Sequence, residues 1–233
     1  MATVTRSKSR AMSRSRSSQR GTTIPEMMTV MVIVGLLMTM LVAVITPMLR
    51  SQNRTQAKLD TVQSAAVALY RIQRDLRQTY YDGTWACTTG SSPSCSQPTT
   101  FGTTNAIAFP TAYHNGTGQF QLKTGSSTPG QPNWQGVMVY WIDSAGDLLW
   151  AFDPTPTGFT DEHVNSTTAA KAVADATTGV LTGTEIAANV QQLSVAIDLT
   201  KPNIISLKMQ AQSTQNGSVN TTTYRSDVLA RNN

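Results

Sequence analysis

Residues 20–49 read RGTTIPEMMTVMVIVGLLMTMLVAVITPML, and this stretch decides the architecture that the sequence predicts. The 23 residues from Met27 to Leu49 carry no charge. A helix needs about 20 apolar residues to cross the hydrocarbon core of a bilayer. The run is also longer than the apolar core of a secretory signal peptide, which has about 7–15 residues. We therefore predict a membrane-spanning helix.

The charges that flank this run predict its orientation. Residues 1–21 hold six basic residues and no acidic one, whereas Arg50, Arg54 and Lys58 follow the run with Asp60 close behind. Because Lys and Arg near a span stay on the cytoplasmic side, the N-terminus is predicted inside and the bulk of the chain outside. An Arg/Ser-rich leader also occurs in RNA-binding arms, but its position directly before a span favours an anchor.

Nearly all of the excess positive charge lies in this leader. The whole chain has 18 basic and 13 acidic residues, so that without the leader it is close to neutral. The predicted folded part therefore gives no electrostatic reason to expect a nucleic-acid partner.

The junction Arg20-Gly21-Thr22-Thr23-Ile24-Pro25-Glu26 resembles the type III signal of type IV prepilins and type II secretion pseudopilins. In that family a basic leader ends in Gly, and a Glu is the fifth residue after the cut; Gly21 and Glu26 occupy these places. The resemblance implies cleavage between Gly21 and Thr22 by a prepilin peptidase. It also implies methylation of the new amine on Thr22, although the family usually has Phe at this first mature position.

Two roles for Glu26 are open at this point. The resemblance implies that its carboxylate neutralises the amine of Thr22 on a neighbouring subunit during assembly. Alternatively, Thr23 and Glu26 have the spacing of a capping box, with Pro25 tolerated in the first helical turn. A carboxylate near a helix N-terminus is also favoured by the helix dipole.

The helix is predicted to continue from the membrane to Thr79, with a kink after Pro47. Apolar residues recur there at intervals of three or four, which predicts an amphipathic helix lying on a globular domain. The predicted buried stripe contains Leu59, Val62, Ala66, Leu69, Ile72 and Leu76. The residues predicted to face solvent are Arg71, Arg74, Asp75 and Arg77.

Beyond residue 80 the pattern changes to short β segments separated by turn residues. The clearest hairpin is predicted at Gly136–Asp143 and Asp147–Asp153. Asn216-Gly217 predicts a tight turn between the last two strands. The other predicted strands are Asn105–Tyr113, Gln119–Lys123, Val190–Leu199, Ile204–Ala211 and Thr221–Ala230, and a short helix is predicted near Thr168–Ala176.

These predictions give an α+β protein with a long N-terminal α-helix packed on a small antiparallel β-sheet domain. Its expected parts are a leader (1–21), a membrane and assembly helix (22–49), an amphipathic continuation (50–80) and an extracytoplasmic β-rich domain (81–233).

The segments YRIQRDLRQT and TTYRSDVLARNN resemble the J-type minor pseudopilins and the W-type minor pilins. This resemblance implies a structural subunit of a type IV pilus or a type II secretion pseudopilus. Its implied partners are other pilin subunits, the prepilin peptidase and the inner-membrane assembly platform. The implied location is the inner membrane and then a periplasmic or cell-surface filament. The alternative is a pilus-tip module that binds a ligand in adhesion or DNA uptake; the sequence contains no catalytic motif, so we expect no enzyme.

Cys87 and Cys95 are predicted to form a disulfide, because an extracytoplasmic compartment permits one. Free thiols or a metal-binding pair are the alternatives. His114 and His163 belong to no metal-ligand pattern. Two acidic clusters suggest calcium, but neither has EF-hand spacing, and turn chemistry explains the first pair more simply; no metal or cofactor is expected. The acidic residues concerned are Asp143 and Asp147 in the first cluster, and Asp153, Asp161 and Glu162 in the second.

Overall fold

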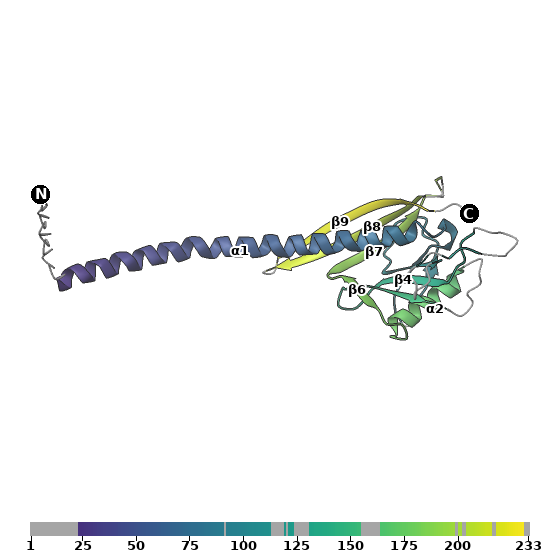
Figure 1. The fold of residues 1–233 in the computed structure, drawn as a ribbon, viewed down its shortest axis with the longest axis horizontal. Coiled ribbons are helices and arrows are strands. Elements are labelled where there is room, and N and C mark those ends of the chain that lie inside the picture. The colour runs from purple at the N-terminus through teal and green to yellow at the C-terminus, as the bar shows by residue number, and fades with distance from the viewer. Residues whose placement is uncertain are drawn as a thin grey trace, which may run out of the picture. The chain divides into compact units, whose positions relative to one another are not determined.

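The computed structural model describes residues 23–90, 92–112, 119, 121–123, 131–154, 164–198, 200–201, 204–215 and 218–230. Within these residues it has two α-helices, one short 3₁₀ helix and nine β-strands, which confirms the α+β class (Figure 1). The chain divides into two compact units, Met1–Ser51 and Gln52–Asn233, and each is described here by itself.

Helix α1 spans Ile24–Leu76 and so contributes residues to both units. Pro47 lies inside it. The helix ends three residues before the predicted Thr79, and the next amides still bond back to its last turn. Gln78 N donates to Asp75 O at 3.2 Å, and Thr79 N donates to Leu76 O at 3.2 Å. The short helix η1, Tyr81–Gly83, follows.

In the second unit, α1 buries a stripe that differs from the predicted one. Leu69, Ile72 and Leu76 are buried as predicted, but Leu59 is 50% exposed and Ala66 is exposed. The small residues Ala65 and Ala68 are buried in their place. The buried face of α1 therefore combines two small alanines with Leu69, Ile72 and Leu76, and the prediction for Leu59 and Ala66 was wrong.

Six strands form one antiparallel sheet in the order β2-β1-β3-β4-β5-β6. The predicted hairpin is confirmed as β4 and β5, which pair Tyr140 with Trp150. The strands are β1 Trp85–Cys87, β2 Cys95–Ser96, β3 Ala106–Thr111, β4 Gly136–Ile142, β5 Leu148–Asp153 and β6 Thr184–Ala187.

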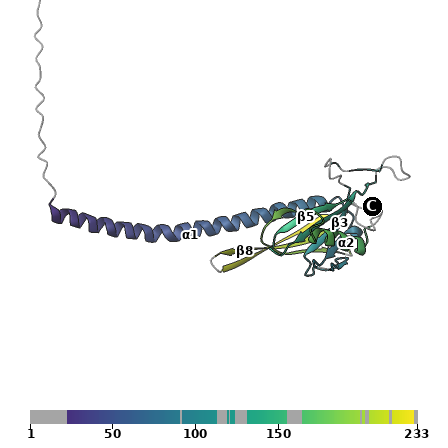
Figure 2. The ribbon, with the colours of Figure 1, turned by 90° about the horizontal axis from the view of Figure 1, so that it is seen from below.

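The central strands of this sheet are buried on both faces. Alternate residues of β3 and β4, such as Phe109 and Tyr140, share a core with α1. The intervening residues, such as Ala108 and Val139, share a second core with helix α2, Ser166–Thr177. These strands therefore read as continuous apolar runs, as strands covered on both faces do. Figure 2 shows α2 next to β3 in the folded domain.

Helix α2 confirms the short helix predicted near Thr168–Ala176. Asn165 caps its start, since the Asn165 side chain accepts a bond from Thr168 N at 2.8 Å. An asparagine at this position satisfies an amide that has no partner inside the helix.

The remaining three strands form a second antiparallel sheet in the order β7-β8-β9. They are β7 Val190–Ile197, β8 Ile204–Gln215 and β9 Ser218–Leu229. β8 and β9 pair from Ile204↔Leu229 to Gln215↔Ser218, so β8 is four residues longer than predicted. The predicted turn Asn216-Gly217 lies outside the described residues.

One predicted strand is not formed. Among the described residues of Gln119–Lys123, the chain has only an isolated bridge between Leu122 and Pro132. The predicted strand Asn105–Tyr113 is confirmed over Ala106–Thr111, and Tyr113 lies outside the described residues.

Candidate functional site

The start of α1 carries the first group of candidate site residues. Glu26 N and Met27 N donate to Thr23 O at 3.0 and 3.2 Å, which makes Thr23 the capping residue. The Glu26 carboxylate turns back and accepts from Thr23 N at 3.4 Å. The Thr23 hydroxyl also donates to the Glu26 carboxylate at 3.4 Å and does not accept from the Glu26 amide, so only the Glu26 half of the predicted capping box is formed.

The two residues of the predicted cleavage site, Gly21 and Thr22, lie outside the described residues. Cleavage between them, methylation of Thr22 and a contact of Glu26 with a neighbouring subunit all stay predictions.

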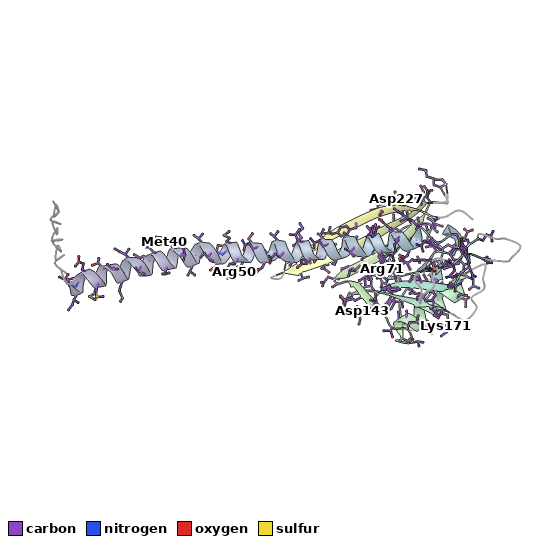
Figure 3. All side chains as sticks on the ribbon, in the orientation of Figure 1. Met40, Arg50, Arg71, Asp143, Lys171 and Asp227 are labelled. Carbon is purple, nitrogen blue, oxygen red and sulfur yellow. A yellow bond between two sulfur atoms is a disulfide. The ribbon has the colours of Figure 1, made fainter. Side chains whose placement is uncertain are left out.

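The part of α1 that lies in the first unit of the chain exposes its apolar side chains. The most apolar 18-residue window of the helix has a mean hydropathy of 2.7, and none of it is buried. Length and composition make this helix a candidate membrane span, the feature expected from the sequence. Figure 3 shows side chains projecting all around this part of α1, with Met40 and Arg50 labelled. Exposed apolar surface of this extent is typical of a membrane or protein contact.

The hydroxyl groups in this segment bond to carbonyls of their own helix. Thr29 Oγ1 donates to Pro25 O at 2.6 Å, Thr39 Oγ1 to Leu36 O at 2.8 Å and Thr46 Oγ1 to Val42 O at 2.7 Å. In hydrocarbon a hydroxyl without a partner costs several kcal/mol. These threonines therefore do not prevent the segment from lying in a membrane.

The predicted disulfide between Cys87 and Cys95 is confirmed. It joins β1 to β2, where the two cysteines are direct partners in the strand pairing. Cys87 is completely buried, in the core between the six-stranded sheet and α2. The bridge therefore fastens a sheet edge to the core, and does not merely close a surface loop.

A polar cluster fixes the second half of α1 to the six-stranded sheet. Asp75 is only 7% exposed, which makes the prediction that it faces solvent wrong. Its Oδ2 accepts a 2.5 Å bond from the Tyr140 hydroxyl in β4, and its Oδ1 lies 3.0 Å from Arg74 Nε. The Arg71 guanidinium lies 3.9 Å from the centre of the Trp150 ring.

Burial raises the pKa of the Tyr140 hydroxyl far above its ordinary value. The negative charge of Asp75 and the hydrogen bond to it raise this pKa further, while the Arg71 guanidinium offsets part of the rise. Tyr140 therefore stays protonated and acts as a permanent donor to Asp75. The cluster anchors α1, and its buried charge has partners on two sides.

Of the acidic residues that suggest calcium in the sequence, Asp143 has a structural role. Asp143 Oδ1 accepts from Ala145 N and Asp147 N, both at 2.9 Å, so it shapes the hairpin turn. Asp161, Glu162, His114 and His163 lie outside the described residues. Within the described part of the chain, three or more potential metal ligands do not come together anywhere.

The chain was compared with protein-family models, curated proteins and solved structures, and nothing in these three comparisons matches it. Its class therefore rests on its own features: a long apolar N-terminal helix whose second half packs on antiparallel sheets. This arrangement is compatible with a pilin-like architecture.

Proposed function

We propose that this chain is a structural minor pilin or pseudopilin subunit of a type IV pilus or a type II secretion pseudopilus. The observation that carries the proposal is the exposed apolar helix headed by Glu26, which follows a basic leader ending in Gly21. A membrane anchor alone explains the apolar helix. It does not explain a carboxylate placed five residues after a glycine at the end of such a leader.

In this proposal the chain is inserted with its N-terminus in the cytoplasm and its β-rich domain outside. A prepilin peptidase cuts between Gly21 and Thr22, and the amine of Thr22 is then methylated. The apolar part of α1 leaves the bilayer at the assembly platform and packs against the same helix of other subunits. The cut removes the six leader cations and creates the amine that Glu26 of a neighbour neutralises.

Mass spectrometry of the mature chain purified from membranes is the direct test. We expect an N-terminus at Thr22, with a mass increase for one methyl group. A retained Met1, or a cut beyond Leu49, would show that the chain is a different kind of membrane protein.

Two substitutions at Glu26 separate assembly from helix capping. Glu26→Ala removes both the charge and the hydrogen-bond acceptor, whereas Glu26→Gln removes the charge and keeps an acceptor for Thr23 N. If Glu26 pairs with an amine, both variants are cleaved normally and both fail to enter filaments. Normal incorporation of Glu26→Gln would leave capping as the role of this residue.

The alternative of ligand binding at a pilus tip is not favoured by any specific contact in the part of the chain that the structure describes.

A further inference from the structure

β9 is a free edge strand of the three-stranded sheet. It is 12 residues long, contains no proline and pairs with β8 from end to end without a register shift. Among the described residues, no backbone bond outside the β8–β9 ladder involves β9. A long regular edge of this kind offers its unpaired amides and carbonyls to another strand.

The other three sheet edges are shorter or covered. β2 has two residues and β6 has four. β7 is longer, but the segment that precedes β3 lies along its outer side. Ile197 N in β7 donates to Pro98 O at 2.6 Å. Leu193 O in β7 accepts from Thr104 Oγ1 at 3.0 Å. Of the four edges in the described part of the chain, β9 is therefore the long one that is still open.

The hydrogen-bond pattern identifies the backbone groups that point outward from β9. Gln212 N donates to Asn189 O at 2.8 Å, on the β7 side of β8. Because the bonded side alternates from residue to residue along an antiparallel strand, the preceding residue of β8, Ala211, bonds to its β9 partner Thr222. Every second residue of β9, counted from Thr222, therefore bonds to β8, and the residues between them point their amides and carbonyls away from the sheet. The outward residues are Val219, Thr221, Thr223, Arg225, Asp227 and Leu229, and their side chains are exposed.

Two opposite charges on this outward set limit which strand fits the edge. Arg225 and Asp227 lie two residues apart and so share one face of β9, where Figure 3 labels Asp227. Arg225 lies over the Phe101 ring, 4.9 Å from its centre, and is opposite Lys208 in the β8 pairing. Because like charges opposite each other destabilise a sheet, an acidic residue on the other side of Arg225 is favourable. Asp227 accepts from Ser206 Oγ through one carboxylate oxygen only, at 2.6 Å.

The nearby carboxylates do not form an ion pair with Arg225. Asp198 lines the same cavity as Arg225. It accepts instead from Thr200 N at 2.9 Å and from Thr200 Oγ1 at 2.6 Å, within its own turn. The ion pairs of the described residues lie on α1 and α2, so Asp227 and Asp198 are both beyond ion-pair distance from Arg225. The edge thus presents a plus–minus order with little net charge, and the complementary strand has the minus–plus order.

We propose that the free edge of β9 pairs with an extended strand of a different subunit in the same filament, one that places an acidic residue next to Arg225 and a basic residue next to Asp227. A minor subunit has neighbours of other sequences, so a contact between unlike chains suits it and does not need to repeat. When a strand is added to a sheet edge, main-chain bonds supply affinity and side chains supply specificity. A strand without the complementary order places an apolar or like-charged residue next to these charges, which disfavours it. This inference rests on the proposed function, since it places the contact in the filament.

Hydrogen exchange at single-residue resolution tests whether the edge is paired. The full chain is compared in detergent and in filaments assembled with the other subunits. In detergent we expect the outward amides of Thr221, Thr223 and Arg225 to exchange rapidly, while β8 protects those of Thr222 and Tyr224. In filaments both sets are protected, and the outward amides exchange roughly tenfold more slowly than in detergent. Outward amides that exchange equally fast in both samples would overturn the pairing.

Cross-linking within the filament tests the identity of the partner. A photo-reactive amino acid replaces Thr223, whose exposed side chain lies at the centre of the outward set. Assembled filaments are irradiated, and the cross-linked peptides are sequenced. We expect this chain to be joined to a subunit of another sequence, at a strand that carries an acidic and a basic residue two positions apart. A cross-link between two copies of this chain, or to a segment without that charge order, would contradict the proposal.

Exchange of the two charges tests the chemistry of the contact. The double variant Arg225→Asp/Asp227→Arg keeps the net charge and reverses the order, so each new side chain meets a like charge on the proposed strand. We expect incorporation into filaments to fall by roughly two- to tenfold, with no loss in thermal stability of the chain in detergent. Lys171→Asp/Asp175→Lys is the matched control, because it makes the same exchange in an ion pair on α2. An equal fall in both variants, or no fall in the β9 variant, would show that the charge order does not matter.

The results distinguish this contact from the proposed function. If the chain is cleaved after Gly21 and enters filaments while the outward amides of β9 stay unprotected, the edge contact is wrong and the pilin-like function stands. If the chain is neither cleaved nor assembled, both proposals are wrong.

Discussion

The hydroxyl of Tyr140 donates a 2.5 Å hydrogen bond to Oδ2 of the buried Asp75, and this contact joins the interior strand β4 to α1. The same carboxylate receives Arg74 at its other oxygen. The helix is thus held to the sheet by a polar pair as well as by apolar packing.

Replacing Tyr140 with Phe removes the donor and leaves the Asp75 carboxylate buried with fewer partners. We expect the free energy of unfolding to fall by about 1–3 kcal/mol, which is the cost of an unsatisfied buried polar group. Urea unfolding of the full chain in detergent, followed by circular dichroism, measures this change. Tyr70→Phe is the control, because Tyr70 lies on α1, the helix that carries Asp75, and is 67% exposed. An equal loss in both variants would contradict a special role for the pair.

The stability of the domain should decrease above pH 10, and Tyr140 should contribute to the decrease. Its pKa in the folded domain is far above the unfolded value of about 10. Below pH 10 the hydroxyl is protonated in both states, and its contribution to stability is fully present. As the pH rises above 10, the unfolded chain loses this proton and the folded chain keeps it. The free energy of unfolding then falls, by up to about 1.4 kcal/mol per pH unit.

Comparison with Tyr140→Phe isolates this contribution, because the pKa values of Tyr80 and Tyr224 are also raised by burial. We expect the variant to lose stability less steeply than the unsubstituted chain between about pH 10 and 11.5. If the free energy of unfolding falls equally steeply with pH in both chains, Tyr140 has the same pKa in the folded and the unfolded state.

The sequence predicted the parts of this fold that depend on long or regular patterns. The uncharged run from Met27 to Leu49 predicted the exposed apolar helix, and the two apolar segments on either side of the turn at residues 144–146 predicted the β4–β5 hairpin. β1, β2 and β6 were missed because strands of two to four residues are too short to show a period. Tertiary contacts stabilise these short strands: a disulfide joins β2 to β1, and β6 pairs with β5.

The candidate site was predictable to a similar extent. The contact between Thr23 and Glu26 at the start of α1 follows from their spacing, and the disulfide was predicted from the two cysteines together with the predicted extracytoplasmic side. The burial of Asp75 could not be predicted, because its partner Tyr140 is 65 residues away in the chain. One signal pointed to it: Asp75 lies between Ile72 and Leu76, on the side of the helix that packs on the sheet.

Removing the disulfide should destabilise the domain through its unfolded state. A bridge across eight residues contributes about 2.5 kcal/mol in the chain-entropy description. We expect the double variant Cys87→Ala/Cys95→Ala to lose about this amount in urea unfolding. Cys87→Ser should cost more than Cys95→Ser, because Cys87 is completely buried whereas Cys95 is only partly buried. Equal losses would mean that loss of the bridge is the whole effect.

Gly136 is required by the close approach of two backbones where β4 begins. A Cβ atom at this position would lie 2.1 Å from Asp153 O and 2.8 Å from Pro154 Cα, and backbone atoms cannot move away as a flexible side chain can. We expect Gly136→Ala to separate the ends of β4 and β5 and to cost about 1–3 kcal/mol, as overpacking does. Gly102→Ala is the matched control, since its Cβ would meet only a methyl group of Thr104 at 3.9 Å. The two variants are compared by thermal unfolding of the full chain. A Gly136→Ala variant as stable as Gly102→Ala would show that β4 and β5 do not approach this closely at Gly136.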